Sequence, residues 1–388
     1  PPKAAGLDAR AFRPPVRALA LQHRGGHPTR RLRSNVLGLC IAATALAGCS
    51  RTQPEALFTD YLYRVGNAID TELDTRPWRD VSTPSLAYPD RAGLTLDIPG
   101  RRVDFLAFLR LHRCELATLV GERNSGLGRV MGPVRRWHYE ARLLVAAEAC
   151  LERLGSSDDA DELADKLGIV LADKRRDYPR HRWNALVAGP EWQRHFRLSE
   201  SAFDPERDGA TARATLAALT HLFRIAGDHR AVAATPIETL EGWFAAVEQN
   251  GSGGRLRKAA HLLEATLDEA AAGVASRVTG RPLCPSARAT PKARIAHKVF
   301  LKYYAQGMQP YLATTLSTYE QWHQAIRRLT ALAGDGIADA PAPDWLQTAA
   351  PAALRRAVAT HTQAWQDLLG QCDLMPSAPV PAGTGTPH

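Results

Sequence analysis

From about residue 54 onward, apolar residues recur with the spacing of an α-helix and not with the alternation of a β-strand. In the first such stretch a single stripe is formed by Phe58, Tyr61, Leu62, Val65 and Ile69. Residues three and four apart share one helix face, so this spacing predicts a helix with one buried side. The preceding Thr52-Gln53-Pro54-Glu55 has the spacing of a capping box and predicts where that helix begins.

The same periodicity continues to the end of the chain. It predicts helices over residues 102–120, 134–154, 159–178, 210–226, 255–278, 290–332 with a kink at Pro310, and 351–370, and one opened by a second capping box at Thr235-Pro236-Ile237-Glu238. Residues 74–100 contain four prolines and predict an extended connection in which Leu94-Thr95-Leu96 forms a short strand at most. The run Asn250-Gly251-Ser252-Gly253-Gly254 predicts a flexible break, either a loop or a domain boundary.

These elements predict an all-α fold. We expect a single multi-helix domain of antiparallel helical hairpins over residues 54–375, with little or no β-structure. No tetratricopeptide-like or other internal repeat is evident. Residues 376–388 are rich in Pro, Gly and Thr and predict a disordered tail.

The first 53 residues follow a different pattern. Arg30-Arg31-Leu32-Arg33 precedes an uncharged run over residues 34–48, which ends in small residues. These are the parts of a secretory signal, here residues 30–48, and the run is shorter than the roughly 20 apolar residues that a membrane span needs. Leu46-Ala47-Gly48-Cys49 resembles the lipobox of bacterial lipoproteins, which implies cleavage before Cys49 and acylation of the cysteine with diacylglycerol and a fatty acid such as palmitate. The alternative is a short buried helix with an incidental cysteine.

The residues around Cys49 also carry information on location. Ser50, and not Asp, follows the cysteine, which by resemblance to lipoprotein sorting implies the inner leaflet of a Gram-negative outer membrane, facing the periplasm. Residues 49–53 would be a lipidated tether of at most about 17 Å, so the fold should lie close to the membrane. Residues 1–29 lack Met and are rich in Arg, Pro and Gly, and we interpret them as an upstream non-structural segment translated from a start assigned too early.

Charge adds an exclusion. The 388 residues have 49 Lys and Arg against 40 Asp and Glu, a formal charge of +9. Residues 1–48 contribute eight basic side chains and one acidic one, so the rest of the chain is nearly neutral, with 41 against 39. A nucleic-acid partner is therefore not indicated for the mature protein.

Four cysteines remain after the signal and the lipid site, and they are Cys114, Cys150, Cys284 and Cys372. In a hairpin of the helices over residues 102–120 and 134–154, Cys114 and Cys150 are equidistant from the Gly-rich connection near residue 132. We therefore predict a Cys114–Cys150 disulfide, the alternative being two buried free thiols. Cys284 and Cys372 would meet if the last two helices pack antiparallel, although the long connection over residues 334–344 leaves this second bridge undecided.

Motifs that carry chemistry are absent from the sequence. It contains no Gly-x-Ser-x-Gly, His-Glu-x-x-His, Cys-x-x-Cys, P-loop, EF-hand or Ser-x-x-Lys motif, and its histidines are scattered, so we assign no catalytic residue, metal ligand or cofactor. His297 has no second ligand one helical turn away, and the aromatic residues over 300–311 are explained by core packing. The one unusual connection is Glu122-Arg123-Asn124-Ser125, followed by Gly-rich residues. Capping of a helix end explains these four residues, and a binding site is the alternative.

These residues bring out a resemblance. Several segments together resemble an uncharacterised bacterial lipoprotein family, domain of unknown function 3080. They are the lipobox, Cys114-Glu115-Leu116, the segment from Glu122 to Met131, Trp183-Asn184-Ala185, Gln309-Pro310-Tyr311-Leu312 and Gln371-Cys372-Asp373. The resemblance covers essentially the whole mature chain and leaves out residues 1–29. It implies an exported helical lipoprotein and no particular activity.

Three classes of function remain open. The first is a cell-envelope interaction or scaffold lipoprotein with an envelope protein as partner, which the anchor and the lack of a catalytic signature favour. The second is a periplasmic hydrolase or a protein that binds a glycan or small ligand at the Glu122–Ser125 turn. The third, a lipid or small-molecule carrier, requires an apolar cavity between helices. The sequence leaves enzymatic activity and oligomeric state undecided.

Overall fold

The computed structural model describes residues 53–79, 87–100, 114, 116–154, 161–198, 201–338, 340 and 351–375. The chain divides into two compact units, residues 1–51 and 52–388, and all of the described residues belong to the second. The predicted signal over residues 30–48, the lipid site Cys49 and the tail over residues 376–388 lie outside the described residues.

The described residues form helices and no strand, which confirms the all-α prediction. The elements are α2 (Pro54–Ile69), α3 (Arg91–Leu94), α5 (Leu116–Asn124), α6 (Gly126–Arg129), α7 (Pro133–Leu154), α8 (Asp161–Leu186), α9 (Pro190–His195), α10 (Pro205–Ala226), α11 (His229–Ala234), α12 (Ile237–Glu248), η3 (Gln249–Gly251), α13 (Ser252–Gly280), α14 (Pro291–Val299), η4 (Phe300–Met308), α15 (Gln309–Gly334) and α17 (Pro351–Gln371).

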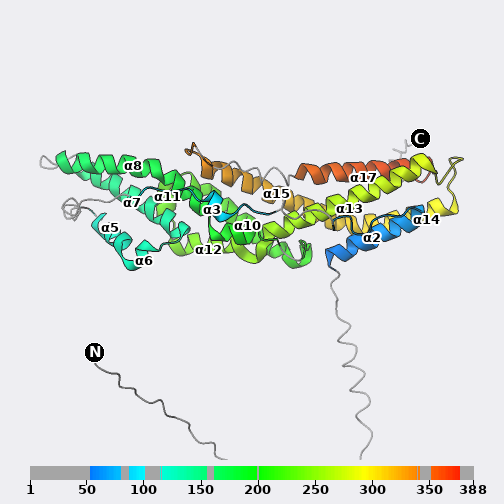
Figure 1. The fold of residues 1–388 in the computed structure, drawn as a ribbon, viewed down its shortest axis with the longest axis horizontal. Coiled ribbons are helices and arrows are strands. Elements are labelled where there is room, and N and C mark those ends of the chain that lie inside the picture. The colour runs from blue at the N-terminus through cyan, green and yellow to red at the C-terminus, as the bar shows by residue number, and fades with distance from the viewer. Residues whose placement is uncertain are drawn as a thin grey trace, which may run out of the picture. The chain divides into compact units, whose positions relative to one another are not determined.

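The described helices form two groups. Helix α13 packs along α17 and α2, and α7 packs along α8 and α11, while α10 and α15 lie between the two groups (Figure 1). One hydrophobic core runs through both groups. Its largest side chains are the four fully buried tryptophans Trp137, Trp183, Trp322 and Trp365.

The structure contains both disulfide bridges. Cys114 is joined to Cys150 with their Cα atoms 5.6 Å apart, and Cys284 is joined to Cys372 at 5.2 Å. The first bridge ties the segment before α5 to α7, as the hairpin argument predicts. The second joins the connection before α14 to the end of α17. Both bridges are buried.

Two predicted capping boxes are wrong. Helix α2 begins after Gln53 with Pro54 in its first turn, and Glu55 instead accepts a hydrogen bond from the backbone N–H of Ala202 and pairs with Lys258. At the start of α12, Thr235 ends α11 and its hydroxyl donates back to the carbonyl of Ala231. In both places the helix begins one residue later than the box predicts, so Gln53 and Pro236 occupy the N-cap positions and neither makes a side-chain capping bond.

The glycine run over residues 251–254 is not a flexible break. Helix α13 begins at Ser252, and Gly253 and Gly254 are buried inside its first turn. A Cβ on Gly254 would overlap the backbone carbonyl of Arg197, and one on Gly253 would overlap the ring of His195. The glycines therefore allow α13 to approach the end of α9 closely, and only Gly251 needs a positive φ, of 57°.

The boundaries of the last helices also differ from the predicted ones. Thr290 caps α14 by accepting from the backbone N–H of Ala293, as its sequence predicts, but the expected kink at Pro310 is replaced by the π-helical η4 before it. The π-helix changes the helical register, so Pro310 falls in the first turn of α15, where a missing N–H costs little.

The strand proposed at Leu94-Thr95-Leu96 is wrong, because the side-chain amide of Asn184 makes both hydrogen bonds to the backbone of Leu96. Helix α8 continues through Pro179 to Leu186, beyond the predicted end.

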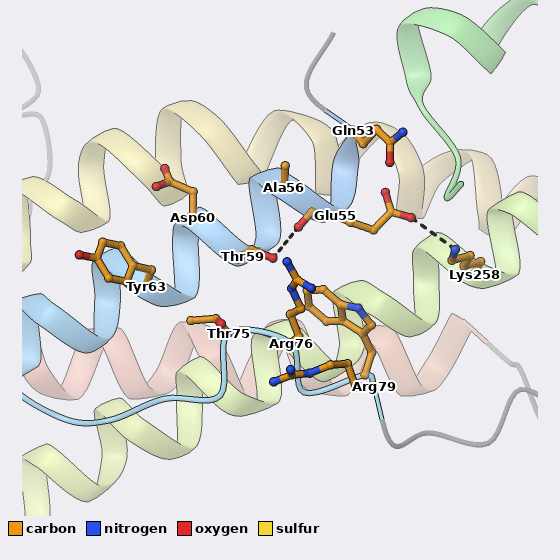
Figure 2. Close-up of a pocket in the computed structure, with 11 residues that line it drawn as sticks. Gln53, Glu55, Ala56, Thr59, Asp60, Tyr63, Thr75, Arg76, Arg79 and Lys258 are labelled. Atoms are coloured by element: carbon orange, nitrogen blue, oxygen red, sulfur yellow. Dashed lines mark hydrogen bonds and ion pairs between the residues drawn. The ribbon is translucent and has the colours of Figure 1, made fainter. Parts of the chain in front are cut away.

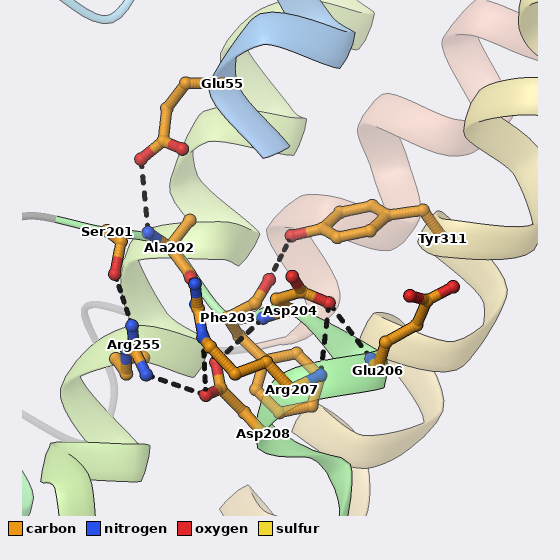
Figure 3. A network of polar contacts seen from close by, with 10 residues as sticks. All are labelled: Glu55, Ser201, Ala202, Phe203, Asp204, Glu206, Arg207, Asp208, Arg255 and Tyr311. Carbon is orange, nitrogen blue, oxygen red and sulfur yellow. Dashed lines mark hydrogen bonds and ion pairs between the residues drawn. The ribbon is translucent and has the colours of Figure 1, made fainter. Parts of the chain in front are cut away.

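A buried polar network holds the start of α10 against its neighbours (Figure 3). Asp204 caps α10, and its own backbone N–H donates to Asp208, whose side chain is almost fully buried. Arg255 of α13 donates to Asp208 at 2.7 Å. The Tyr311 hydroxyl of α15 donates to the carbonyl of Phe203 at 2.6 Å. A buried carboxylate is costly unless it is paired in this way, so the network serves packing.

Candidate functional site

The four residues of the Glu122–Ser125 turn divide into two pairs. Glu122 is exposed and forms an ion pair with Arg142 at 3.3 Å. Ser125 caps α6: its Oγ accepts from the N–H of Gly128 at 3.0 Å and donates to the carbonyl of Glu122 at 2.7 Å. These contacts are structural and confirm that capping explains part of the turn.

Arg123 and Asn124 face a groove. Arg123 donates through Nη1 to the carbonyl of Gly128 at 2.5 Å, which braces α6 against the end of α5. It also lines the groove, as does the exposed Asn124, whereas Glu122 and Ser125 do not. The turn predicted from sequence therefore contributes two of its four residues to one hollow.

The groove runs between α5, α7 and α8, with a volume of about 1430 Å³. Much of the lining is apolar: α5, the segment after α6, α7 and α8 contribute Leu116, Val120, Val130, Met131, Pro133, Leu143, Leu163, Leu167 and Val170. Pockets for drug-sized ligands commonly have volumes of about 300–1,000 Å³. This groove is therefore large enough for a ligand with an extended apolar part.

Cations dominate the polar side of the groove. The basic side chains are Arg91, Arg123, Arg129, Arg136, Lys166 and Lys174, and the one acidic side chain among the described lining residues is Asp177. Behind these side chains Glu140, only 1% exposed, pairs with Arg136 at 2.6 Å and with Lys174 at 2.9 Å. Glu140 fixes these two cations at the groove, and the excess positive charge of the lining favours an anionic ligand.

Burial shifts the pKa of two lining groups. Burial lowers the pKa of His181, so this ring stays neutral although Glu140 is 3.7 Å away. Tyr139 donates to the carbonyl of Leu119, and burial raises its pKa above the ordinary value. Fixed cations, a neutral imidazole and apolar side chains are binding groups. Among the described lining residues, none is arranged as a nucleophile beside a general base.

A second hollow, of about 820 Å³, lies beside the start of α2 (Figure 2). Lys258 pairs with Glu55 at 3.4 Å and Arg79 with Asp74 at 3.0 Å. Two of its three cations are therefore neutralised by carboxylates of this chain, whereas three of the six cations of the α5–α8 groove form no ion pair among the described residues, so the hollow offers an anion less charge.

Two buried histidines lie outside both hollows. The ring of His195 has no exposed area; its Nδ1 lies 2.7 Å from the carbonyl of Val247, and its Nε2 accepts from the indole of Trp322. Burial lowers its pKa to about 4. In the same way His361, beside the Tyr61 hydroxyl at 2.6 Å, has a pKa lowered to about 3. Both rings are neutral parts of the core. In the described part of the chain, no three His, Cys, Asp or Glu side chains gather as metal ligands would.

Sequence reasoning missed most of the groove. Arg91 comes from α3, Arg129 from α6, Arg136 from α7 and Lys174 from α8. These positions are up to 83 residues apart, and no local spacing joins them. The one local signal was the pair Arg123 and Asn124 at the end of α5.

The comparisons with known proteins agree with the motifs. The family model described as a protein of unknown function, DUF3080, matches residues 58–376, so the chain belongs to this family. The match includes the groove and all four bridged cysteines. Nothing among the curated proteins or the solved structures matched the chain. None of the helices in the described ranges combines the length and hydropathy that a membrane span requires.

Proposed function

We propose that this member of the DUF3080 family is a lipid-anchored protein of the bacterial cell envelope that binds an anionic amphiphile in the α5–α8 groove. The observation that carries the proposal is the composition of the groove, which has a volume of about 1430 Å³ and is lined by six basic side chains, one acidic side chain and many apolar ones. Arg136, Lys166 and Lys174 are paired with Glu140 or Glu162, and the other three cations form no ion pair among the described residues. Cations bind an anionic head group, and apolar side chains bind a hydrocarbon or another apolar moiety.

The envelope location is supported by the sequence around the anchor. Leu46-Ala47-Gly48-Cys49 follows a basic and then an apolar segment, and Ser50 follows the cysteine. We propose attachment through Cys49 to the inner leaflet of the outer membrane, with the folded unit facing the periplasm. The two disulfides fit an oxidising compartment.

Anchoring is tested by metabolic labelling with radioactive palmitate and by fractionation. Cys49→Ala should abolish labelling and release the protein from washed membranes, because acyl chains contribute about 0.8 kcal/mol per buried methylene. A Cys40→Ala variant, which changes a cysteine inside the signal, is the matched control and should label normally. A Cys49→Ala protein that stays in membranes after a high-salt wash contradicts the anchor.

Ligand binding is tested by calorimetry with decyl phosphate, using decyl glucoside as the neutral counterpart. Arg91 and Arg129 line the groove, are exposed, and form no side-chain ion pair within the described residues. Replacing both with Ala should raise the Kd for decyl phosphate about tenfold, which is about 1.4 kcal/mol for two charge-assisted contacts. Arg224→Ala, at an exposed position on α10, is the matched control. Equal affinity for the phosphate and the glucoside contradicts the proposal.

A second candidate function is recognition of an envelope protein, and one observation favours it. Leu127 and Val130, on and just after α6, are 84% and 77% exposed. Exposed aliphatic side chains at the tip of a hairpin suit a protein interface. Leu127→Ser should weaken capture of such a partner and leave decyl phosphate binding unchanged, because Leu127 does not line the groove.

A further inference from the structure

An outward ridge on α14 and η4 joins positive charge to exposed apolar side chains. Arg294, Lys298 and Lys302 are spaced four residues apart, and Lys298 and Lys302 are exposed. Beside them Ile295 and Leu301 are 55% and 40% exposed. We call these five residues the α14 ridge. No acidic residue occurs from residue 291 to residue 319, so the ridge has no internal countercharge.

Neighbouring side chains extend the ridge onto α2, which packs against both α14 and η4. The Tyr303 ring lies between two cations, 5.1 Å from the Arg64 guanidinium and 5.4 Å from the Lys302 ammonium. Tyr63, next to Arg64, is 54% exposed. Cations, tyrosines and aliphatic side chains on one surface are the residues that lie at a membrane interface.

The nearby carboxylates pair with cations outside the five residues of the α14 ridge. Asp60 pairs with Arg64 at 3.1 Å, and Asp70 pairs with both Lys292 and Arg281. Lys298 has no ion-pair partner among the described residues. The ridge therefore keeps a positive excess that an anionic surface can meet.

The position of the proposed lipid anchor favours a bilayer, and not another anionic partner, as the surface that the ridge contacts. Helix α2 begins at Pro54, five residues after Cys49, so about 17 Å of extended chain separates the lipid from the fold. Near that end of α2, a Cβ on Gly307 of η4 would lie 3.8 Å from the side chain of Leu57, so η4 runs alongside the tethered helix. A protein with so short a tether must place one side against the membrane, and the ridge is next to the tethered helix.

We propose that the α14 ridge lies on the anionic phospholipid headgroups of the bilayer that holds the anchor. The lysines and Arg294 would contact phosphates, while Ile295 and Leu301 would enter the boundary of the acyl chains. The inference rests on the proposed anchor for its choice of membrane, but the ridge itself can be tested without any acyl chain.

The test is sedimentation of the mature chain, residues 49–388, carrying Cys49→Ala, with vesicles. It should bind vesicles of phosphatidylethanolamine and phosphatidylglycerol in a 3:1 ratio but not phosphatidylcholine vesicles, and 0.5 M salt should release it, because salt screens surface charge. The pair Lys298→Gln and Lys302→Gln should lower the partition coefficient roughly 30-fold, since each interfacial cation contributes about fivefold. Ile295→Ser with Leu301→Ser should also weaken binding.

Matched controls keep the inference falsifiable. Arg327→Gln with Arg328→Gln removes the same charge from an exposed part of α15, and Ile169→Ser changes a 67% exposed isoleucine on α8. Both should bind like the parent. Equal losses in ridge and control pairs, or no binding to anionic vesicles, would overturn the inference. If Cys49 carries palmitate but the ridge variants bind vesicles like the parent, the lipid anchor is supported and the ridge inference is overturned. If the ridge binds anionic vesicles but Cys49 carries no palmitate, only the proposed anchor is overturned.

Discussion

Reduction of the two disulfides should remove most of the stability of this fold. Cys114–Cys150 closes a sequence separation of 36 residues and Cys284–Cys372 one of 88. In the chain-entropy model these loops restrict the unfolded chain by about 3.8 and about 4.6 kcal/mol. The loops neither overlap nor enclose one another, so their contributions should add to about 8 kcal/mol. Typical unfolding free energies are about 5–15 kcal/mol, so the reduced protein should be marginal.

The assay is urea unfolding of oxidised and reduced protein. Reduced wild type is the right comparison, because it retains every sulfur atom and changes only the cross-links. The Cys114→Ala/Cys150→Ala variant should lose about 4 kcal/mol and Cys284→Ala/Cys372→Ala about 5 kcal/mol, the latter having the longer loop. A variant lacking all four cysteines should be insensitive to reductant. Losses under 1 kcal/mol, or peptide mapping that links Cys114 to Cys284, would refute the reasoning.

Two other substitutions test the interior and the turn. The pKa of His195 is lowered to about 4 from an unfolded value near 6.5, so the unfolded state binds the proton first, and the unfolding free energy should fall by up to about 3 kcal/mol as the pH drops from 6.5 to 4. His195→Gln should reduce that pH dependence, and the part that remains is expected from His361, whose pKa is lowered to about 3; a pH curve parallel to that of the parent would show that His195 is not a responsible group. Arg123→Ala should lower stability by about 1 to 2 kcal/mol in urea unfolding, because the carbonyl of Gly128 loses its donor; an unchanged midpoint would assign Arg123 to ligand binding alone.

Local patterns were sufficient for most of the long helices and for one bridge. The stripe from Phe58 to Ile69 is buried in α2, and Cys114 and Cys150, which are equidistant from residue 132, form a disulfide. Both predictions depend on residues that are close in sequence, within one helix or within one hairpin. Contacts of this kind are encoded by spacing alone.

Contacts between segments far apart in the chain could not be predicted from the sequence. Gly254 suggested a loop because glycine lowers helix propensity, yet its role is to admit the carbonyl of Arg197, which lies 57 residues earlier. The groove is a similar case, since its cations converge only when α6, α7 and α8 pack together. The polar residues Arg123 and Asn124 indicated one turn of the groove from sequence, and the packing of the helices supplies the remaining residues.

The central claim, a groove for an anionic amphiphile, is tested most directly by photoaffinity labelling with an alkyl phosphate that carries a diazirine in its chain. The account predicts crosslinks on α7 and α8 at Leu143, Leu163 or Val170, which belong to the apolar part of the lining, with labelling competed by decyl phosphate and not by decyl glucoside. Labelling confined to Leu127 on α6, or spread over the outer surfaces of α13 and α17 without competition, would contradict it.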